Sequence, residues 1–414
     1  MALDQPPSDS PLPALEALEA LPEPLMLVGG GEPGDLAARR VVFANAAARE
    51  LFRIPPEGGL LASAIRRPEV LEAVEETLAH GVEAAARFDS GGPQERSWRV
   101  WSRPLMQGGR RIVLLVMHDE TDARRNERMR ADFLANASHE LRTPLASLTG
   151  FIETLRGHAR EDAAARDRFL RIMAGQAHRM GRLIDDLLSL SRIELNEHIP
   201  PAGACDLALA VADVLDAVGP LVRERSVAIE TVLPPRGEAV VVGDRDQILQ
   251  VVQNLIDNAA KYSAPGQALR IEVCAGLRLD EAKAGGQAAP PHLPGNWARL
   301  PILTPGDAAD GERYASVRVV DRGPGIDRAR LPRLSERFYR VEGQKSGERA
   351  GTGLGLAIVK HITNRHRGGL TVESAPGAGS AFTAYFPMGR TEPAEPAEPP
   401  ATAAAEIAAV TKLS

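Results

Sequence analysis

Cysteine is scarce in this sequence of 414 residues, and no long hydrophobic run is present. The two cysteines, Cys205 and Cys274, are far apart and lack the spacing of metal-ligand pairs, which favours a reducing cytosol. The longest apolar candidate, residues 112–117, is only as long as a strand, whereas a membrane span needs about 18 residues. The N-terminus has neither the basic region nor the apolar core of a signal peptide. We therefore expect a soluble, cytoplasmic protein.

Basic clusters with interleaved aromatic residues are also missing, and the formal net charge is -6. Both observations argue against a nucleic-acid-binding surface, so we expect no nucleic-acid partner. Hydrophobic residues make up 44% of the chain and charged residues 25%, which is an ordinary globular composition. A chain of this length has room for about two to four domains, each with its own core.

The N-terminal part of the sequence predicts a small α+β domain. Residues 1–20 are expected to be a loose or short helical lead-in, and residues 21–118 contain helical and strand patterns around glycine-rich turns. Residues 119–130 are highly charged and favour a helical linker that continues without a breaker into the next segment. Residues 390–414 contain the repeat PAEPAEPP and are expected to be a disordered tail.

A single histidine, His139, lies beside Glu140 in a segment with the periodicity of a helical bundle. Residues recur there at alternating steps of three and four, the seam of a coiled coil: Leu134, Ser138, Leu141, Leu145, Leu148, Ile152 and Leu155. His139 falls outside the seam, where an exposed imidazole beside a carboxylate is a plausible nucleophile. A surface histidine on an isolated helix usually has no such role, so the remaining sequence must decide.

Residues 131–198 are expected to form a helical hairpin. The second helix carries its own heptad seam: Phe169, Met173, Gln176, Met180, Leu183, Leu187 and Leu190. A polar hinge over residues 158–167 separates the helices, and Pro144 is expected to loosen or bend the first one. Two helices of this length cannot enclose a core alone, so we expect a homodimer in which two copies form a four-helix bundle.

Residues 203–388 alternate between helical and strand patterns, which predicts an α/β domain. Asp244 is a good N-cap for a helix over residues 245–262, with Gln247 three residues further on. Residues 275–313 separate two strand patterns and carry many glycines and prolines with little periodicity. We interpret this separator as a long surface insertion.

Three polar residues of the helix over residues 245–262 share one face, opposite its apolar face: Asn254, Asn258 and Lys261. A solvated polar face explains their spacing equally well. The functional alternative is a site for nucleotide phosphates and a metal. Amide oxygens suit a Mg²⁺ ion that takes its other ligands from water and phosphates.

Two glycine motifs follow. In DRGPGI, Asp321 stands at a strand end, where it can accept a hydrogen bond from an exocyclic amine such as N6 of adenine, and Gly323 and Gly325 let a base approach the backbone. In GTGLGL, residues 351–356, glycines precede a helix N-terminus whose free N–H groups suit a polyphosphate. Each motif alone is weak, and GTGLGL is neither a Walker A motif nor a Rossmann fingerprint.

The order of the motifs resembles that of the bacterial sensor histidine kinases. SHELRTPL, NLIDNAAKY, DRGPGI, ERFYR and GTGLGL match the H, N, G1, F and G2 boxes of that family. The segment before the H box, with an upstream domain that resembles a PAS sensory domain, looks most like the phosphate-regulon sensor kinases. The resemblance implies a multidomain fold: a PAS-like domain, a dimeric four-helix bundle and a two-layer ATP-binding sandwich of the GHKL or Bergerat type.

The resemblance also implies roles for individual residues. His139 would be the phospho-acceptor, Glu140 would orient its ring and take its proton, and Thr143 would position the water that dephosphorylates a partner. Asn258 would be the Mg²⁺ ligand, and Asp321 would bind adenine. The other implied ATP contacts are Asn254, Lys261, Tyr262, Gly323, Gly325, Ile326, Arg340, Lys345, Gly351, Thr352, Gly353, Leu354, Gly355 and Leu356.

The implied function is autophosphorylation with ATP and Mg²⁺, transfer to an aspartate of a response regulator, and regulator phosphatase activity, with phosphate starvation as the expected context. Three departures stand out. Leu334-Ser335 replaces an apolar–aromatic pair before ERFYR, and residues 275–313 make a longer link than usual between the N and G1 regions. The sequence also shows no transmembrane helix, where most relatives have them. We therefore expect an internal cue, or recruitment to a membrane-associated sensing complex. Two alternatives stay open: a phosphatase-dominant protein and a non-catalytic nucleotide-binding scaffold.

Overall fold

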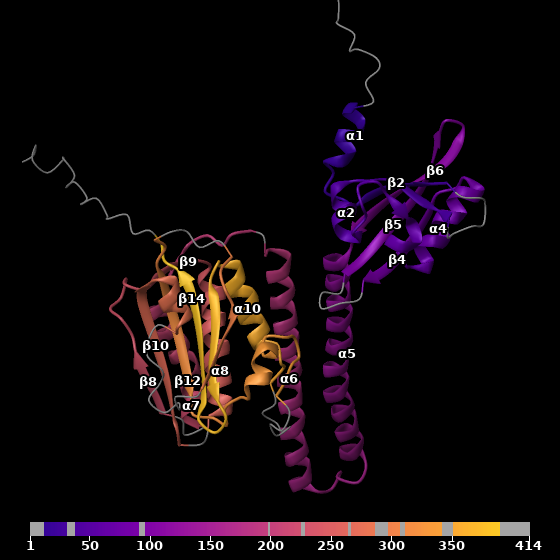
Figure 1. Ribbon diagram of the computed structural model, residues 1–414. Helices are drawn as coiled ribbons and strands as arrows, with labels where there is room; N and C mark the ends of the chain where they lie inside the picture. The colour runs from indigo at the N-terminus through magenta and orange to yellow at the C-terminus, as the bar shows by residue number, and fades with distance from the viewer. Residues whose placement is uncertain are drawn as a thin grey trace, which may run out of the picture. The chain divides into compact units, whose positions relative to one another are not determined.

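The computed structural model describes residues 12–30, 38–90, 96–197, 199–224, 228–263, 266–285, 297–306, 311–341 and 351–389. The chain divides into two compact units, Met1–Ala135 and Asn136–Ser414, which can be followed by colour in Figure 1. The predicted disordered tail, residues 390–414, and the candidate Lys345 lie outside the described residues. None of the described helices combines the length and the apolar character that spanning a lipid bilayer requires.

The first unit contains an antiparallel sheet with the strand order β3-β2-β1-β6-β5-β4. Its elements are α1 Leu12–Glu19, β1 Leu25–Gly29, β2 Arg40–Ala44, α2 Ala46–Phe52, β3 Gly59–Leu60, α3 Leu61–Ala64, α4 Pro68–His80, β4 Ala84–Ser90, β5 Arg96–Gln107 and β6 Arg110–Asp119. Within the predicted α+β domain, β1 pairs with β2 and β5 pairs with β6, both antiparallel.

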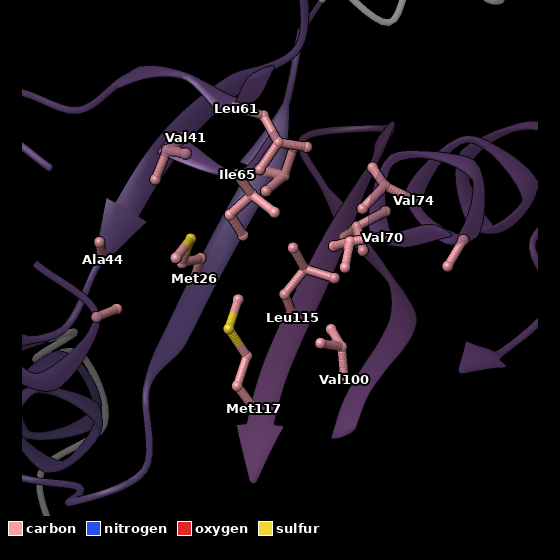
Figure 2. Packing of buried hydrophobic residues seen from close by; sticks show 14 of the residues in the cluster. Met26, Val41, Ala44, Leu61, Ile65, Val70, Val74, Val100, Leu115 and Met117 are labelled. Atoms are coloured by element: carbon pink, nitrogen blue, oxygen red, sulfur yellow. The ribbon is translucent and has the colours of Figure 1, made fainter. Parts of the chain in front are cut away.

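Alternating apolar residues decide which face of this sheet is buried. In β6, Val113, Leu115 and Met117 are fully buried and the residues between them are more exposed, the pattern of a strand with one face on a core. Val70 and Val74 lie one helical turn apart on α4 and belong to the same core, as Figure 2 shows. This packing accounts for the apolar periodicity of both elements.

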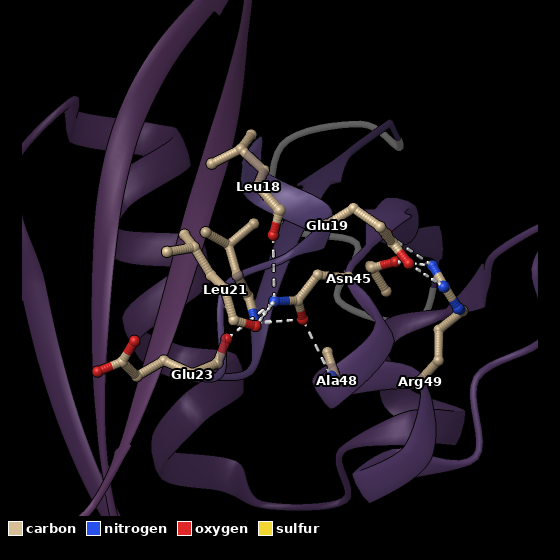
Figure 3. Close-up of polar contacts among 9 residues, drawn as sticks. Leu18, Glu19, Leu21, Glu23, Asn45, Ala48 and Arg49 are labelled. Atoms are coloured by element: carbon tan, nitrogen blue, oxygen red, sulfur yellow. Dashed lines mark hydrogen bonds and ion pairs between the residues drawn. The ribbon is translucent and has the colours of Figure 1, made fainter. Parts of the chain in front are cut away.

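Asn45 joins three elements of the first unit and is fully buried. Its Oδ1 accepts hydrogen bonds from the backbone N–H groups of Leu25 and Ala48, both at 3.0 Å, and thereby caps α2. Its Nδ2 donates to carbonyls at Leu18, Leu21 and Glu23, which hold the end of α1 against β1 (Figure 3). The described part of the lead-in, residues 12–20, therefore contains a short helix that is tied to the domain.

Two long helices follow: α5, Thr121–Arg156, and α6, Ala163–Leu195. The charged linker is part of α5, as predicted, and Pro144 lies within α5 without ending it. The expected hinge over residues 158–167 is too long, because α6 begins at Ala163. Asp162 caps that helix by accepting a hydrogen bond from the Ala165 N–H at 2.9 Å. The hinge therefore ends about one helical turn earlier than predicted.

The hairpin buries little of its own apolar surface. Leu183, Leu190 and Ile193 are the buried apolar residues of α6. Large apolar side chains of the hairpin remain exposed in the single chain: Leu145, Ile152, Leu170, Ile184, Leu188 and Leu195. Several of these lie on or beside the predicted seams, so the single chain leaves an apolar face without cover.

The rest of the second unit is an α/β domain in two layers (Figure 1). Its larger sheet has the order β11-β13-β14-β12-β10-β8, and β7 pairs separately with β9. The elements are β7 Ala204–Asp206, α7 Leu207–Glu224, β8 Ala228–Val232, β9 Val240–Val242, α8 Arg245–Tyr262, β10 Ala268–Leu277, α9 Leu279–Lys283, β11 Ala298–Leu303, β12 Tyr314–Asp321, the 3-10 helix η2 Arg328–Arg333, α10 Gly355–Arg365, β13 Gly369–Ala375 and β14 Gly379–Pro387.

The prediction that residues 275–313 are only a surface insertion is wrong for their described part. Strand β10 extends into it, α9 follows, and β11 pairs with β13, with Arg299 opposite Glu373. Arg299 donates to Glu373 at 2.6 Å, and Arg318 forms a second ion pair with the same carboxylate, which is fully buried. The segment therefore extends the sheet, and Ala282 of α9 packs in a small core beside it.

Candidate active site

A cavity of about 390 Å³ brings together motifs that are far apart in the sequence. It is lined by residues of α6 and α8, by the end of β12 and by the segment before α10. The predicted site residues that line it are Asn254, Asn258, Lys261, Tyr262, Asp321, Gly325, Ile326, Arg340, Gly351, Thr352, Gly353, Gly355 and Leu356. Of the remaining predicted contacts, Gly323 and Leu354 do not line it but adjoin residues that do.

Helix α8 presents its polar face to this cavity because its apolar face is buried beneath it. Ile248, Val252 and Leu255 are essentially fully buried, whereas Asn258 and Lys261 line the cavity. The helix begins as predicted, with Asp244 accepting hydrogen bonds from the N–H groups two and three residues on. The register of this cap fixes which side chains reach the cavity.

Asp321 ends β12 at the floor of the cavity, with only 4% of its surface exposed. Burial raises the pKa of this carboxyl to about 6, although N–H groups of Gly323 and Ser380 donate hydrogen bonds that act in the opposite direction. The Gly323 N–H lies 2.8 Å from Oδ1. At neutral pH the group is therefore largely an anion, held in a pocket where an amino group of a ligand can meet it.

Gly325 shows why the motif after Asp321 needs glycine. Its φ angle is +67°, a conformation that other residues rarely adopt. A Cβ at this position would lie 1.9 Å from the carbonyl oxygen of Ala375, so a side chain cannot fit without a backbone shift. The wall of the cavity is therefore bare backbone at this point.

The segment before α10 closes the other side. Gly353 has a φ angle of +77°, and its carbonyl accepts a hydrogen bond from the Phe338 N–H at 2.9 Å. A Cβ on Gly355, the first residue of α10, would come within 2.8 Å of the side-chain oxygen of Asn254. Arg340 donates to the carbonyl of Gly351. The glycines thus allow the N-terminus of α10 to lie close against α8.

The helix hairpin supplies lining residues that sequence reasoning missed: Arg179, Arg182, Asp185 and Asp186 of α6. Asp186 accepts a hydrogen bond from the Thr352 hydroxyl at 2.7 Å. Burial raises the pKa of this carboxyl, and the bond from Thr352 partly offsets the rise. Periodicity along α6 could place such residues on one face, but it could not reveal what that face meets.

His139 is exposed on α5, as its place outside the heptad seam predicts. Its neighbour Glu140 forms an ion pair with Arg179 of α6, with Nη2 and Oε2 3.0 Å apart. The Thr143 hydroxyl donates to the carbonyl of His139 at 3.2 Å, so its proton is used within the helix. The three residues occupy one turn of α5, outside the set that lines the cavity.

Two family comparisons cover the helix hairpin and the α/β domain. Residues 129–196 match the His Kinase A (phospho-acceptor) domain. Residues 243–390 match the family described as histidine kinase-, DNA gyrase B-, and HSP90-like ATPase. Residues of both matched segments line the cavity.

Among curated proteins, the chain is similar to the phosphate regulon sensor protein PhoR of Pseudomonas aeruginosa, with 33% identity over 69% of this chain and 56% of that protein. It is 31% identical to the sensor-like histidine kinase SenX3 of Mycolicibacterium smegmatis, over 69% of this chain and 64% of that protein. The sensor histidine kinase RppB of Synechocystis is 34% identical over 62% of this chain and 48% of that protein. The chain thus spans about half to two thirds of the length of these relatives.

Proposed function

The chain belongs to the sensor histidine kinases of bacterial two-component systems, and from this premise we propose that it transfers the γ-phosphoryl group of ATP to His139. One observation carries the proposal: three motifs that are separate in the sequence line one cavity beside α6. They are the polar face of α8, the Asp321 turn and the segment 351–356. An adenine nucleotide needs an acceptor for its amino group, backbone that the base can approach, and a site for its phosphates. The Asp321 turn offers the first two, and the polar face of α8 together with the segment 351–356 offers the third.

Asp321 is proposed to hold the adenine ring by accepting a hydrogen bond from its amino group. Gly325 leaves bare backbone beside it, where the flat face of a base fits. At the other end, Lys261 and Arg340 line the cavity near the N-terminus of α10, and their charges suit the phosphates. Tyr262 and Ile326 also line the cavity.

Mg²⁺ is the metal that this donor set fits. Within the described part of the chain, no cluster of three or more histidine, cysteine, aspartate or glutamate side chains could hold a metal by itself. Asn258 and Asn254 offer amide groups to the cavity, which suits an ion that takes most of its ligands from phosphate oxygens and water. Asn258 is the proposed ligand, and the bound ion would neutralise charge on the phosphates.

His139 is the proposed nucleophile, and Glu140 the residue that orients its ring and takes its proton. His139 is exposed and lies outside the cavity lining, so the α/β domain must move relative to a phospho-acceptor helix before transfer. Phosphoryl transfer depends mainly on position and charge neutralisation, which makes such a movement a natural point of control. Contacts between α6 and the α/β domain, such as the Arg337–Glu194 ion pair, would have to break.

The active form is proposed to be a homodimer. The apolar side chains of Leu145 and Ile152 remain about half exposed in the single chain, at 55% and 45%. Two copies of the hairpin packed as a four-helix bundle would cover this face. The dimerisation and phospho-acceptor region then corresponds to the proposed residues 131–198, and the ATP-binding domain to residues 203–388.

The phosphoryl group is proposed to pass from His139 to an aspartate of a response regulator. Thr143, one helical turn away, would position the water molecule that dephosphorylates that regulator.

The likeness to the phosphate regulon sensor protein supports phosphate starvation as the context. The antiparallel order β2-β1-β6-β5-β4 supports a PAS-like sensor over residues 21–118. A cytoplasmic location, with recruitment to a membrane-associated sensing complex, is part of the same proposal.

Incubation of the purified chain with γ-labelled ATP and Mg²⁺ tests the proposal. We expect acid-labile, alkali-stable label on the wild type and none on His139→Gln. His178→Gln is the matched control, because His178 is also an exposed histidine on a helix of the hairpin, and it should keep the label. Label that persists in His139→Gln would refute the assigned acceptor. Absence of label in the wild type, with ATP still bound, would favour the phosphatase or scaffold alternative.

A further inference from the structure

Arg179 occupies a position between the two halves of the proposed reaction. It lies on α6, and its guanidinium forms an ion pair with Glu140 at 3.0 Å, where the side chains are 23% and 30% exposed. The same residue lines the cavity that we assign to ATP. It therefore contacts the residue beside His139 and borders the nucleotide site at the same time.

A guanidinium in this position can pair with either of two anions, the Glu140 carboxylate or the phosphates of ATP. It carries five N–H donors in a rigid fork that fits a carboxylate or a phosphate equally well in shape. A triphosphate carries several negative charges and is the stronger partner in a partly desolvated site. While Glu140 is paired with Arg179, the guanidinium occupies its Oε2 at 3.0 Å, so that oxygen is not available to the His139 ring.

We propose that Arg179 is a positioning residue that couples nucleotide binding to the phospho-acceptor helix. The phosphates of bound ATP draw its guanidinium away from Glu140, and the released carboxylate is then able to orient His139 and accept its proton. Without the nucleotide, Glu140 stays paired with Arg179 and does not act on His139. This inference rests on the proposed function for the roles of Glu140 and His139.

Coupling of this kind is reciprocal. If bound phosphates weaken the Arg179–Glu140 pair, the charge of Glu140 must weaken the binding of phosphates by the same factor. A half-buried ion pair is worth on the order of a fivefold change in an equilibrium constant. Removing the charge of Glu140 should therefore tighten ATP binding, and only while Arg179 is present.

Arg182 provides the matched control. It lies three residues further along α6 and lines the same cavity, so its substitution removes an equal charge from the same surroundings. Its electrostatic partner is Asp186 on its own helix. A general loss of positive charge affects Arg179→Gln and Arg182→Gln alike, whereas the proposed coupling is lost in Arg179→Gln alone.

The test is a set of binding measurements with a non-hydrolysable ATP analogue and Mg²⁺ on the full chain. We expect Glu140→Gln to tighten binding about fivefold in the wild-type and Arg182→Gln backgrounds, and to have no effect in the Arg179→Gln background. An AMP control should show no effect of Glu140→Gln, since it lacks the β- and γ-phosphates. Equal effects of Glu140→Gln in all three backgrounds, or no effect in any, would overturn the inference.

These measurements need no turnover, so the two proposals fail separately. A wild type that binds the analogue but never labels His139 contradicts the proposed function, and the binding cycle still reports whether Arg179 and Glu140 are coupled to the phosphates. If the wild type labels His139 but Glu140→Gln changes analogue binding in none of the three backgrounds, only the role of Arg179 is contradicted. In the labelled protein, Arg179→Lys should restore part of the rate lost in Arg179→Gln, because it restores the charge without the fork.

Discussion

The α/β domain and the helix hairpin hold their functional residues in opposite ways. In the α/β domain, Asp321 is buried and Gly325 is confined by neighbouring backbone, so the cavity is formed by the fold of a single chain. In the hairpin, His139 is exposed, and so are apolar side chains such as Leu145. One region is complete as a single chain, whereas the other presents a nucleophile and an uncovered face that both require a second surface.

This difference separates recognition from control. A binding site made of fixed backbone and a buried carboxylate gains affinity because little has to be ordered when the nucleotide arrives. A phospho-acceptor on an exposed helix must instead meet several surfaces in turn, namely the nucleotide, the regulator and the second copy. The confined residues are therefore expected to tolerate substitution poorly, and the hairpin residues to change assembly or rate while leaving the fold intact.

The largest effect is expected for Gly325→Ala. The new Cβ would lie 1.9 Å from a backbone carbonyl in a conformation with positive φ, and we expect a loss of about 3 kcal/mol or more in domain stability. Gly377→Ala is the control: its φ is +78°, but nothing lies within 4 Å of its Cβ. It should cost about 1 kcal/mol. Thermal unfolding and ATP binding measure both, and equal losses would show that confinement at Gly325 is not decisive.

The next effect concerns Asp321 and pH. Burial raises the pKa of this carboxyl from 3.8 to about 6, so the folded domain binds its proton more tightly than the unfolded chain does. Without nucleotide, the stability it contributes is full below pH 4 and is lost as the pH rises through 6, by about 3 kcal/mol. Asp321→Asn should abolish this loss and stabilise the free domain at pH 7, while ATP affinity falls.

Hydrogen exchange of the β12 amides, measured without nucleotide across this pH range, checks the sign. The difference between wild type and Asp321→Asn should widen from pH 4 to 6 and then stay constant. A difference that does not vary with pH would mean that burial does not raise the pKa of the Asp321 carboxyl. Asp321 would then behave like an exposed aspartate, and the contrast between the α/β domain and the exposed hairpin would weaken.

A third prediction addresses the hairpin. Leu145→Ala removes part of an exposed apolar face that we assign to the dimer, and we expect a loss of about 2 kcal/mol, or about a thirtyfold weaker dimer. Glu153→Ala, at an exposed position of α5 outside the predicted seam, should leave the dimer unchanged. Sedimentation over a range of concentrations measures both. A Leu145→Ala protein that assembles like the wild type would place the interface elsewhere.

The sequence predicts features that are determined locally, and it does not predict features that depend on tertiary contacts. Helix α8 occurs over the predicted residues because its start is set locally, by Asp244, and its buried face by periodicity. Strand β11 was missed because it is a short edge strand that contains Pro301, and it is recognisable only through its pairing with β13. The contribution of α6 to the cavity was missed for the same reason: periodicity shows which residues share a face, and the tertiary fold determines what that face contacts.

The smallest effect is expected for Gly175→Ala, and it tests the hairpin as directly as Gly325→Ala tests the α/β domain. Gly175 is exposed within α6, and nothing lies within 4 Å of an added Cβ. Alanine in a helix interior is favoured over glycine, so we expect the free energy of unfolding to rise by about 0.5–1 kcal/mol. Denaturant unfolding, followed by a signal from the hairpin, measures this change. The substitution should leave nucleotide binding unchanged. A destabilised protein would mean that another surface packs on this part of α6. Since the single chain leaves that position open, the surface would belong to a second copy or to a partner, and the helix would be less free than its exposure suggests.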